Sequence, residues 1–214
     1  MYATKSVYLM SGTWSRPSAS IPTCPPHQKP SLISPIRFCR FRGPTSAAFL
    51  EWLTPSSLAS LSPYSSTLSV LLNEKGGIID DTVITKHSED AFYVVTNAGR
   101  RDRDLSWFTG KIDEWNSDGQ KSEKGKVEME VLEGWGLLAL QGPEAAKYLQ
   151  TLSSFDLRSL TFGRSAFVPL EGFNLHVARG GYTGEDGFEV IPLLVRESLL
   201  TFPLHRFLCL QQKP

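Results

Sequence analysis

Acidic residues are missing from the first 50 positions of this 214-residue chain, although Asp and Glu number 22 in the whole. Lys and Arg also number 22, so the net charge is zero and no overall field draws the chain to nucleic acid or to an anionic membrane. No run of 18 apolar residues occurs, which argues against a membrane-spanning helix. We therefore expect neither nucleic acid nor a membrane as a partner.

Cysteine is also scarce. Cys24, Cys39 and Cys209 are an odd number, which argues against a disulfide framework and favours a reducing compartment. The four histidines are scattered, and no spacing of Cys, His and acidic residues fits a zinc or iron site. We therefore expect no metal.

The acid-poor segment is basic and rich in Ser, Thr and Pro. Two interpretations of residues 1–40 stay open. Mitochondrial targeting segments have this composition, but the prolines oppose a single amphipathic helix and favour a disordered extension. In either case we expect residues 1–40 to lie outside the folded core.

Beyond residue 40, hydrophobic patterns alternate between strands and helices. Alternating residues joined by tight turns predict an antiparallel meander over 66–72, 78–85 and 91–96. A helix follows in which Leu105, Phe108, Ile112 and Trp115 share one face as core residues, with charged residues such as Lys111 on the other faces. Further elements are predicted at 47–53 (helix), after Gly142-Pro143-Glu144 (helix), and at 127–131, 137–140, 165–169, 173–178 and 188–192 (strands). The fold class is therefore α+β, with antiparallel sheets and packed helices.

Two acidic residues interrupt the strand predicted at 78–85. Strict alternation places Asp81 on the same face as Ile79 and Val83, and Asp80 on the opposite face. Either both acids lie solvated near the strand end, or Asp81 is a carboxylate directed into a cavity, where it needs a partner.

A glycine-rich stretch, Arg179-Gly180-Gly181-Tyr182-Thr183-Gly184-Glu185-Asp186-Gly187-Phe188-Glu189, joins two predicted strands. Its glycines allow the backbone to approach a ligand closely. Its carboxylates can accept paired hydrogen bonds from a ring N–H and an exocyclic amine. Alone, such a stretch is also typical of an ordinary hairpin turn.

Four motifs in order resemble the aminomethyltransferase family, the tetrahydrofolate-dependent T-protein of the glycine cleavage system. They are Gly76–Asp81 (GGIIDD), Tyr93–Ala98 (YVVTNA), Leu138–Pro143 (LALQGP) and Gly181–Glu189 (GYTGEDGFE). The resemblance runs from about residue 41 to 193. It implies part of the folate-binding aminomethyltransferase fold: a partial first domain at 41–125, a partial second domain at 126–193, and a tail at 194–214 outside the family pattern.

The resemblance also implies a reaction. A lipoyl group on the partner H-protein carries an aminomethyl group, and the enzyme transfers its methylene to tetrahydrofolate with release of ammonia, in the mitochondrial matrix. Asp81 matches the family's catalytic acid near the folate nitrogens. Glu189 matches the pterin ligand, and Asn97 and Tyr182 match the pocket wall. Glu185 and Asp186 are expected to fix the turn rather than to react.

Departures from the family pattern leave two alternatives open. An amino-terminal Phe-Asp-Val-Ser-His-Met-like motif, an Arg-rich motif and a carboxy-terminal barrel domain are not found in these 214 residues. The chain is therefore expected to be an incomplete version, and an inactive truncated product is one alternative. The other is a non-catalytic folate-binding relative, although the cysteine that marks iron–sulfur assembly relatives is replaced by Arg179-Gly180-Gly181.

Overall fold

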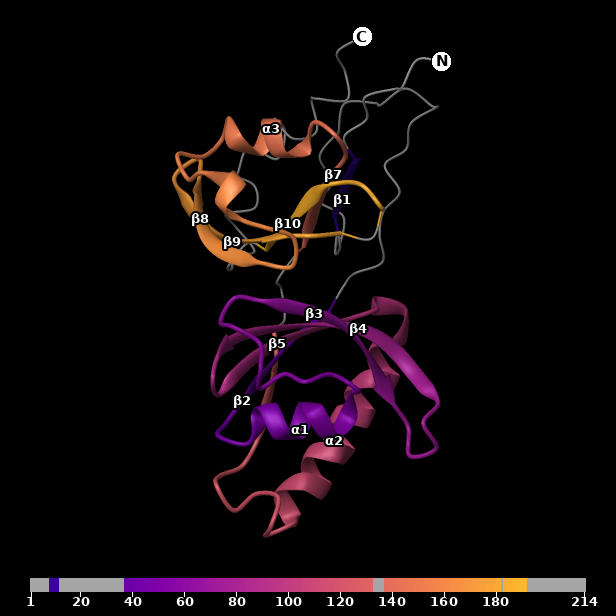
Figure 1. The fold of residues 1–214 in the computed structure, drawn as a ribbon. Coiled ribbons are helices and arrows are strands. Elements are labelled where there is room, and N and C mark those ends of the chain that lie inside the picture. The colour runs from indigo at the N-terminus through magenta and orange to yellow at the C-terminus, as the bar shows by residue number, and fades with distance from the viewer. Residues whose placement is uncertain (1–7, 12–36, 133–136, 182, 192–214) are drawn as a thin grey trace, which may run out of the picture. The chain divides into compact units, whose positions relative to one another are not determined.

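The computed structural model describes residues 8–11, 37–132, 137–181 and 183–191, which form two compact units (Figure 1). The α1/α2 unit comprises residues 36–133 and 163–165, and the α3 unit comprises the other described residues. Each unit contains one five-stranded sheet, and the pairings between strands are antiparallel. The predicted α+β class is thus confirmed. Among the helices described, none is long and apolar enough to span a bilayer.

The sheet of the α1/α2 unit has the strand order β3-β4-β5-β2-β6. Its two long helices, α1 and α2, cover the same face of this sheet (Figure 1). The predicted meander is confirmed as β3, β4 and β5. The elements are β2 (Arg37–Arg42), α1 (Ser46–Leu53), β3 (Ser66–Leu72), β4 (Ile78–Ser88), β5 (Ala91–Thr96), the 3₁₀ turn η1 (Ala98–Arg100), α2 (Arg101–Ser117) and β6 (Glu128–Val131).

Aromatic rings from the sheet and both helices fill the core of this unit. Phe41 of β2 contacts Phe108 of α2 edge-to-face, with ring centroids 5.0 Å apart, and Phe49 of α1 meets Trp115 at 5.6 Å. All but Trp115 are fully buried, and each buried ring of this size stabilises the fold by about 1.5–3 kcal/mol. Of the predicted apolar face of α2, Phe108 and Trp115 are therefore core, and Leu105 and Ile112 pack against the core while half-buried.

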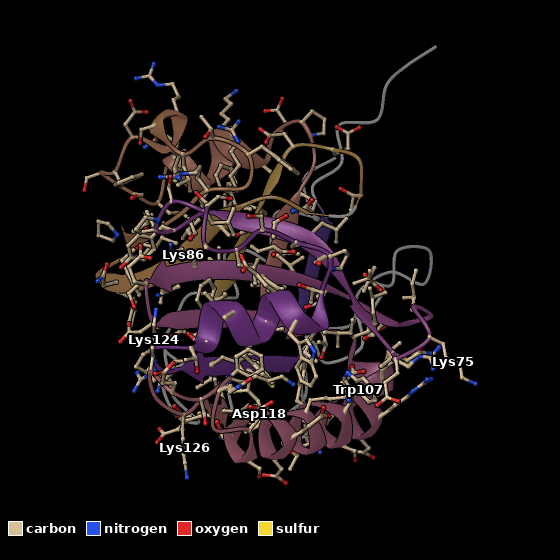
Figure 2. The ribbon with its side chains drawn as sticks, turned by 60° about the horizontal axis from the view of Figure 1, so that its bottom comes forward. Lys75, Lys86, Trp107, Asp118, Lys124 and Lys126 are labelled. Atoms are coloured by element: carbon tan, nitrogen blue, oxygen red, sulfur yellow. The ribbon has the colours of Figure 1, made fainter. Side chains whose placement is uncertain are left out.

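The buried face of α2 also carries two charged residues. Asp104, Phe108, Lys111 and Trp115 are its buried residues, at spacings of four, three and four. Lys111 was expected on an outer face, but its ammonium lies 4.8 Å from the ring centre of Trp107, which Figure 2 labels on α2, and 3.0 Å from Glu74 Oε1. Lys111 is buried because its apolar stem packs against the rings while its ammonium is paired.

The sheet of the α3 unit has the order β1-β7-β10-β9-β8, and α3 covers one of its faces (Figure 1). Helix α3 starts at Ala145, directly after the Gly142–Glu144 turn. Its core includes Leu140, Leu149, Val177 and Phe188. The elements are β1 (Tyr8–Ser11), β7 (Leu138–Gln141), α3 (Ala145–Gln150), the 3₁₀ turn η2 (Leu157–Ser159), β8 (Ser165–Leu170), β9 (Phe173–Arg179) and β10 (Gly187–Ile191).

The structure differs from the expectation for residues 1–40 at two places. Strand β2 starts at Arg37 and lies between β5 and β6, with Phe38 and Cys39 fully buried. Strand β1 pairs with β7. The composition of residues 1–40 predicted a segment outside the folded core, but β2 is a central strand whose apolar side chains are buried. Because β6 pairs with β2, it also belongs to the α1/α2 unit and does not begin the second unit.

Candidate functional site

Asp81 and Asn97 meet at one end of the β4–β5 pair. The antiparallel register sets Thr82 opposite Thr96, so the next residues, Asp81 and Asn97, are neighbours. Asn97 Nδ2 donates to Asp81 Oδ1 at 2.7 Å and to Asp80 Oδ1 at 3.0 Å. Its main-chain N–H donates to Asp80 Oδ2, with an N···O distance of 3.1 Å. Asn97 therefore bridges the two acids and uses both hydrogens of its amide nitrogen.

A β-bulge decides which of the two acids is buried. The register of β3 against β4 shifts between Leu71 and Leu72 and leaves Ile79 as the extra residue. As a result Ile79 and Asp80 are both buried, and Asp81 is exposed. The face assignment from strict alternation, with Ile79 and Asp81 on one side, is wrong for this reason. Asp81 is accessible to a ligand, and the buried acid that needs a partner is Asp80.

Asp104 on α2 is a second buried acid, and its carboxyl group interacts electrostatically with that of Asp80. Its side chain is 1% exposed, and no N–H or O–H group of the described residues is aligned to donate to either of its oxygens. Burial and then the charge of Asp80 raise the pKa of Asp104 to about 7, while the Thr96 hydroxyl and Arg100 act in the opposite direction. The site thus contains a carboxyl group that exchanges its proton near neutral pH.

Glu189 lies in the α3 unit, at the centre of its sheet. The residues directly opposite it on the neighbouring strands are Ala178 of β9 and Ala139 of β7. Directly opposed side chains project from the same face of a sheet, so two small side chains flank the carboxylate. Glu189 is half-buried, and burial raises its pKa. The side chains directly opposite this carboxylate on both neighbouring strands are therefore single methyl groups.

Gln141, at the end of β7, holds the glycine-rich turn. Its Nε2 donates to the Gly180 carbonyl at 2.9 Å, and its Oε1 accepts from the Thr183 hydroxyl at 3.0 Å. A Cβ atom on Gly181 or Gly187 would overlap the Gln141 amide. Glycine is therefore required at these positions by close approach, and the fully buried Gln141 is a fixed support for the turn.

An ion pair closes the base of the same turn. Arg179 Nε and Nη2 donate to Asp186 Oδ1 and Oδ2 at 2.9 and 2.7 Å, which is a bidentate pair. The Arg179 guanidinium holds the pKa of Asp186 below its usual range. Asp186 therefore has the turn-fixing role expected of it, and Glu185 is exposed beside it.

The predicted site residues fall into three groups. Asp81 and Asn97 are brought together by the β4–β5 register. Glu189 belongs to the other unit, and its position relative to Asp81 is not described. Tyr182 lies outside the described residues.

A cavity of about 450 Å³ in the α3 unit contains none of the predicted site residues. Of its charged groups, Arg158 is ion-paired with Asp156, and Arg179 with Asp186. Within the described part of the chain, no cluster of three or more His, Cys, Asp or Glu residues is arranged to hold a metal ion.

Comparison with known proteins adds to this geometry. The GCVT N-terminal domain family matches residues 33–193, about three quarters of the chain. The chain belongs to the GCVT aminomethyltransferase family.

Individual members of the family are similar over the same region. The probable mitochondrial aminomethyltransferase of Schizosaccharomyces pombe is 47% identical over 150 residues, which are 70% of this chain and 36% of that protein. The mitochondrial aminomethyltransferase of Mesembryanthemum crystallinum is 44% identical over 162 residues, 75% of this chain and 38% of the relative. The crystal structure of the glycine cleavage system aminomethyltransferase T from Bartonella henselae matches with a TM-score of 0.65 and 27% identity, over 91% of this chain and 44% of that one. The chain thus spans less than half the length of these relatives.

Three residues that matter to the site were not singled out from the sequence: Asp80 as the buried acid, Asp104 behind it, and Gln141 under the glycine-rich turn. Asp104 precedes Phe108 by four positions, so the helical period already placed it on the core face of α2. A charged residue on that face was a usable signal. Gln141 gave no comparable signal, because its role depends on a contact with a turn about 40 residues later.

Proposed function

We propose that this chain carries folate-binding elements of a tetrahydrofolate-dependent aminomethyltransferase of the glycine cleavage system. The donor is an aminomethyl group bound through sulfur to the lipoyl arm of an H-protein. The carbon–sulfur and carbon–nitrogen bonds of this S–CH₂–NH₂ group break, and the methylene carbon bonds to N5 and N10 of tetrahydrofolate. The two N–H hydrogens of the folate leave with the sulfur and with the amine, which gives dihydrolipoyl and ammonia.

Asp81 is the residue that we assign to this chemistry. It is exposed at a strand end, and Asn97 fixes the orientation of its carboxylate. A carboxylate held in this way beside N10 orients that nitrogen, accepts its proton and stabilises positive charge as the methylene is captured. The Asp81–Asn97 bridge is the observation that carries the proposal, because it gives a solvent-facing acid a fixed direction.

Glu189 is the residue that we assign to the pterin ring. A pterin presents a ring N–H beside an exocyclic amine, and one carboxylate accepts both. The small side chains of Ala178 and Ala139, directly opposite Glu189, support this assignment because they do not cover the carboxylate with bulky groups. In this proposal Tyr182 and Asn97 contribute to the pocket wall.

We extend the proposal to the mitochondrial matrix. The Schizosaccharomyces and Mesembryanthemum relatives are named mitochondrial. The first 50 residues of this chain contain Lys and Arg but no acid, the composition of a matrix-targeting segment. A fusion of residues 1–40 to a fluorescent protein should accumulate in mitochondria; a diffuse cytosolic signal would contradict this assignment.

A transfer assay tests the proposal. The purified chain is mixed with tetrahydrofolate and lipoylated H-protein loaded with the aminomethyl group, and methylenetetrahydrofolate and ammonia are measured together. We expect equimolar formation of the two products. Asp81→Asn should slow it by about 100-fold or more, whereas Asp113→Asn, at an exposed acid on α2, should not. Binding of folate without either product would show a folate-binding chain that does not transfer the group.

A further inference from the structure

Asp104 has a place in the structure that helix stability does not explain. Acids in the first turn of a helix stabilise its positive end, and both Asp102 and Asp104 are in the first turn of α2. The Asp102 side chain is 95% exposed, as expected for that role. Asp104 is 1% exposed and faces the sheet. A buried carboxylate without a donor costs several kcal/mol, so the burial of Asp104 requires another explanation.

The group that Asp104 faces is the carboxyl group of Asp80. Each oxygen of Asp80 already accepts one hydrogen bond from Asn97, one from the main-chain N–H and one from the amide. Both Asp80 oxygens thus have a hydrogen-bond donor, whereas among the described residues neither Asp104 oxygen does. Arg100 is the charged group of opposite sign near Asp104, and the nearby Thr96 hydroxyl also lowers the pKa of Asp104, although its geometry is not that of a regular hydrogen bond. A proton on Asp104, donated to Asp80, removes the repulsion between the two acids and gives one Asp104 oxygen a hydrogen-bond partner.

This hydrogen bond extends a chain of contacts to the solvent-facing acid. The carboxyl groups of Asp104 and Asp80 interact electrostatically. Asp80 accepts from Asn97, and Asn97 donates its second amide hydrogen to Asp81 at 2.7 Å. We propose that Asp104 is a positioning residue, whose protonated carboxyl group holds Asp80 and, through Asn97, fixes the direction of the Asp81 carboxylate. This inference rests on the proposed function only for the catalytic role of Asp81; the hydrogen-bond network itself does not depend on that function.

The consequence is a hydrogen-bond network that depends on one proton. When Asp104 loses its proton, two neighbouring buried carboxylates repel each other and Asp80 is displaced from its position under Asn97. Loss of the proton also leaves Asp104 with no aligned donor. The direction of Asp81 therefore becomes less well defined as the pH rises through the pKa of Asp104, about 7.

Side-chain amide NMR of the ¹⁵N-labelled 214-residue chain tests this inference directly. The Asn97 Nδ2 signals are followed from pH 5 to 9 in the wild type and in three variants. Asp104→Asn keeps a neutral donor of the same size, and Asp104→Leu removes the donor at similar volume. Asp102→Asn is the matched control from the same helical turn.

We expect the wild-type Asn97 signals to shift with a midpoint near pH 7, and Asp102→Asn to behave identically. Asp104→Asn should abolish this shift and keep the signals at their low-pH positions. Asp104→Leu should displace them at every pH. If the wild-type signals do not titrate, or if they titrate unchanged in Asp104→Asn, the inference is overturned. The Asn variant decides the matter even if the Leu variant does not fold.

Binding of 5-formyltetrahydrofolate, measured on the same proteins, separates this inference from the proposed function. At pH 6 we expect Asp104→Asn to bind within about twofold of the wild type, and Asp104→Leu to bind more weakly, by no more than the loss that Asp81→Asn causes. Equal affinity of the Leu variant would overturn the positioning role. If even the wild type binds no folate, the proposed function fails for this chain, and the NMR result alone decides whether Asp104 holds the network.

Discussion

The buried Asp104 makes the stability of the α1/α2 unit depend on pH in an unusual direction. Ordinary Asp loses its proton near pH 3.8, and Asp104 does so at about 7 in the fold because of burial and the neighbouring Asp80. Between these values the folded chain holds one proton more than the unfolded chain. The Asp104 contribution to the unfolding free energy is therefore fully present below about pH 4, falls as the pH rises towards 7, and is constant above it.

The size of this effect follows from the same two pKa values. A difference from 3.8 to about 7, at roughly 1.4 kcal/mol for each pH unit, sets an upper limit of about 4 kcal/mol. Relaxation of the two buried carboxyl groups towards solvent reduces this loss. Asp104→Asn keeps a neutral donor at every pH. We therefore expect its unfolding free energy to increase by about 1–3 kcal/mol relative to that of the wild type as the pH rises from 4.5 to 8.

Urea unfolding at a series of pH values measures this difference. Tryptophan fluorescence is a suitable probe, because Trp52, Trp107 and Trp115 all lie in the α1/α2 unit. The unfolding free energies of variant and wild type have to be subtracted, because His87 makes stability depend on pH in the opposite direction in both proteins. Burial and Arg40 lower the pKa of His87 to about 4, so its contribution rises between about pH 4 and 6.5 in both proteins.

The Asp102→Asn variant is the control for this experiment. It removes an acid from the same helical turn, and its side chain is exposed, so its difference curve should be flat within about 0.5 kcal/mol over this range. The reasoning would be refuted if the difference in unfolding free energy between Asp104→Asn and the wild type did not change with pH. It would also be refuted if the wild type became the more stable of the two as the pH rises.

Three further predictions concern the candidate ligand groups. Asp81→Asn should lower the rate of methylene transfer by about 100-fold or more and folate affinity by much less, because the acid is assigned to proton transfer and charge stabilisation; equal losses in rate and affinity would make it a binding group only. Glu189→Gln should weaken folate binding by ~2–3 kcal/mol in a calorimetric titration, the usual cost of breaking a charge-assisted pair; an unchanged dissociation constant would remove it from the pocket. Gly181→Ala should destabilise the α3 unit by about 1–3 kcal/mol in thermal unfolding, because the new Cβ overlaps the Gln141 amide. Gly180→Ala, where the space is open, is its control, and equal stability of the two variants would contradict the close packing.

Much of the fold follows from local patterns. The strands β3 and β5 alternate clearly, and the apolar spacing on α2 identifies Phe108 and Trp115 as core residues. The Gly-Gly turn before β4 and the short turn before β5 set the antiparallel meander. These features depend on neighbours in the sequence, which is why sequence alone predicts them.

The remaining features depend on contacts between distant residues. Strand β2 has a basic, acid-poor sequence like that of the preceding segment, and only its pairing with β5 and β6 shows that it is a central strand. The bulge at Ile79 reverses the face assignment of the acids that follow it. Lys111 is buried because the rings of α1 and α2 surround its stem.

The candidate site was predicted in the same partial way. Asp81 and Asn97 were selected by resemblance to a family, and the β4–β5 register explains physically why they are neighbours. The buried partner Asp104 comes from a helix that packs onto the strand, so its contact with Asp80 could not be read from either segment alone.

The measurement that tests the central claim most directly is a calorimetric titration of the purified 214-residue chain with 5-formyltetrahydrofolate. The account predicts saturable binding with a dissociation constant of about 1–10 μM, near −7 to −8 kcal/mol, which Glu189→Gln weakens. A folded chain that releases no heat over this range, with the same result by equilibrium dialysis, would contradict the claim that these residues form a folate site.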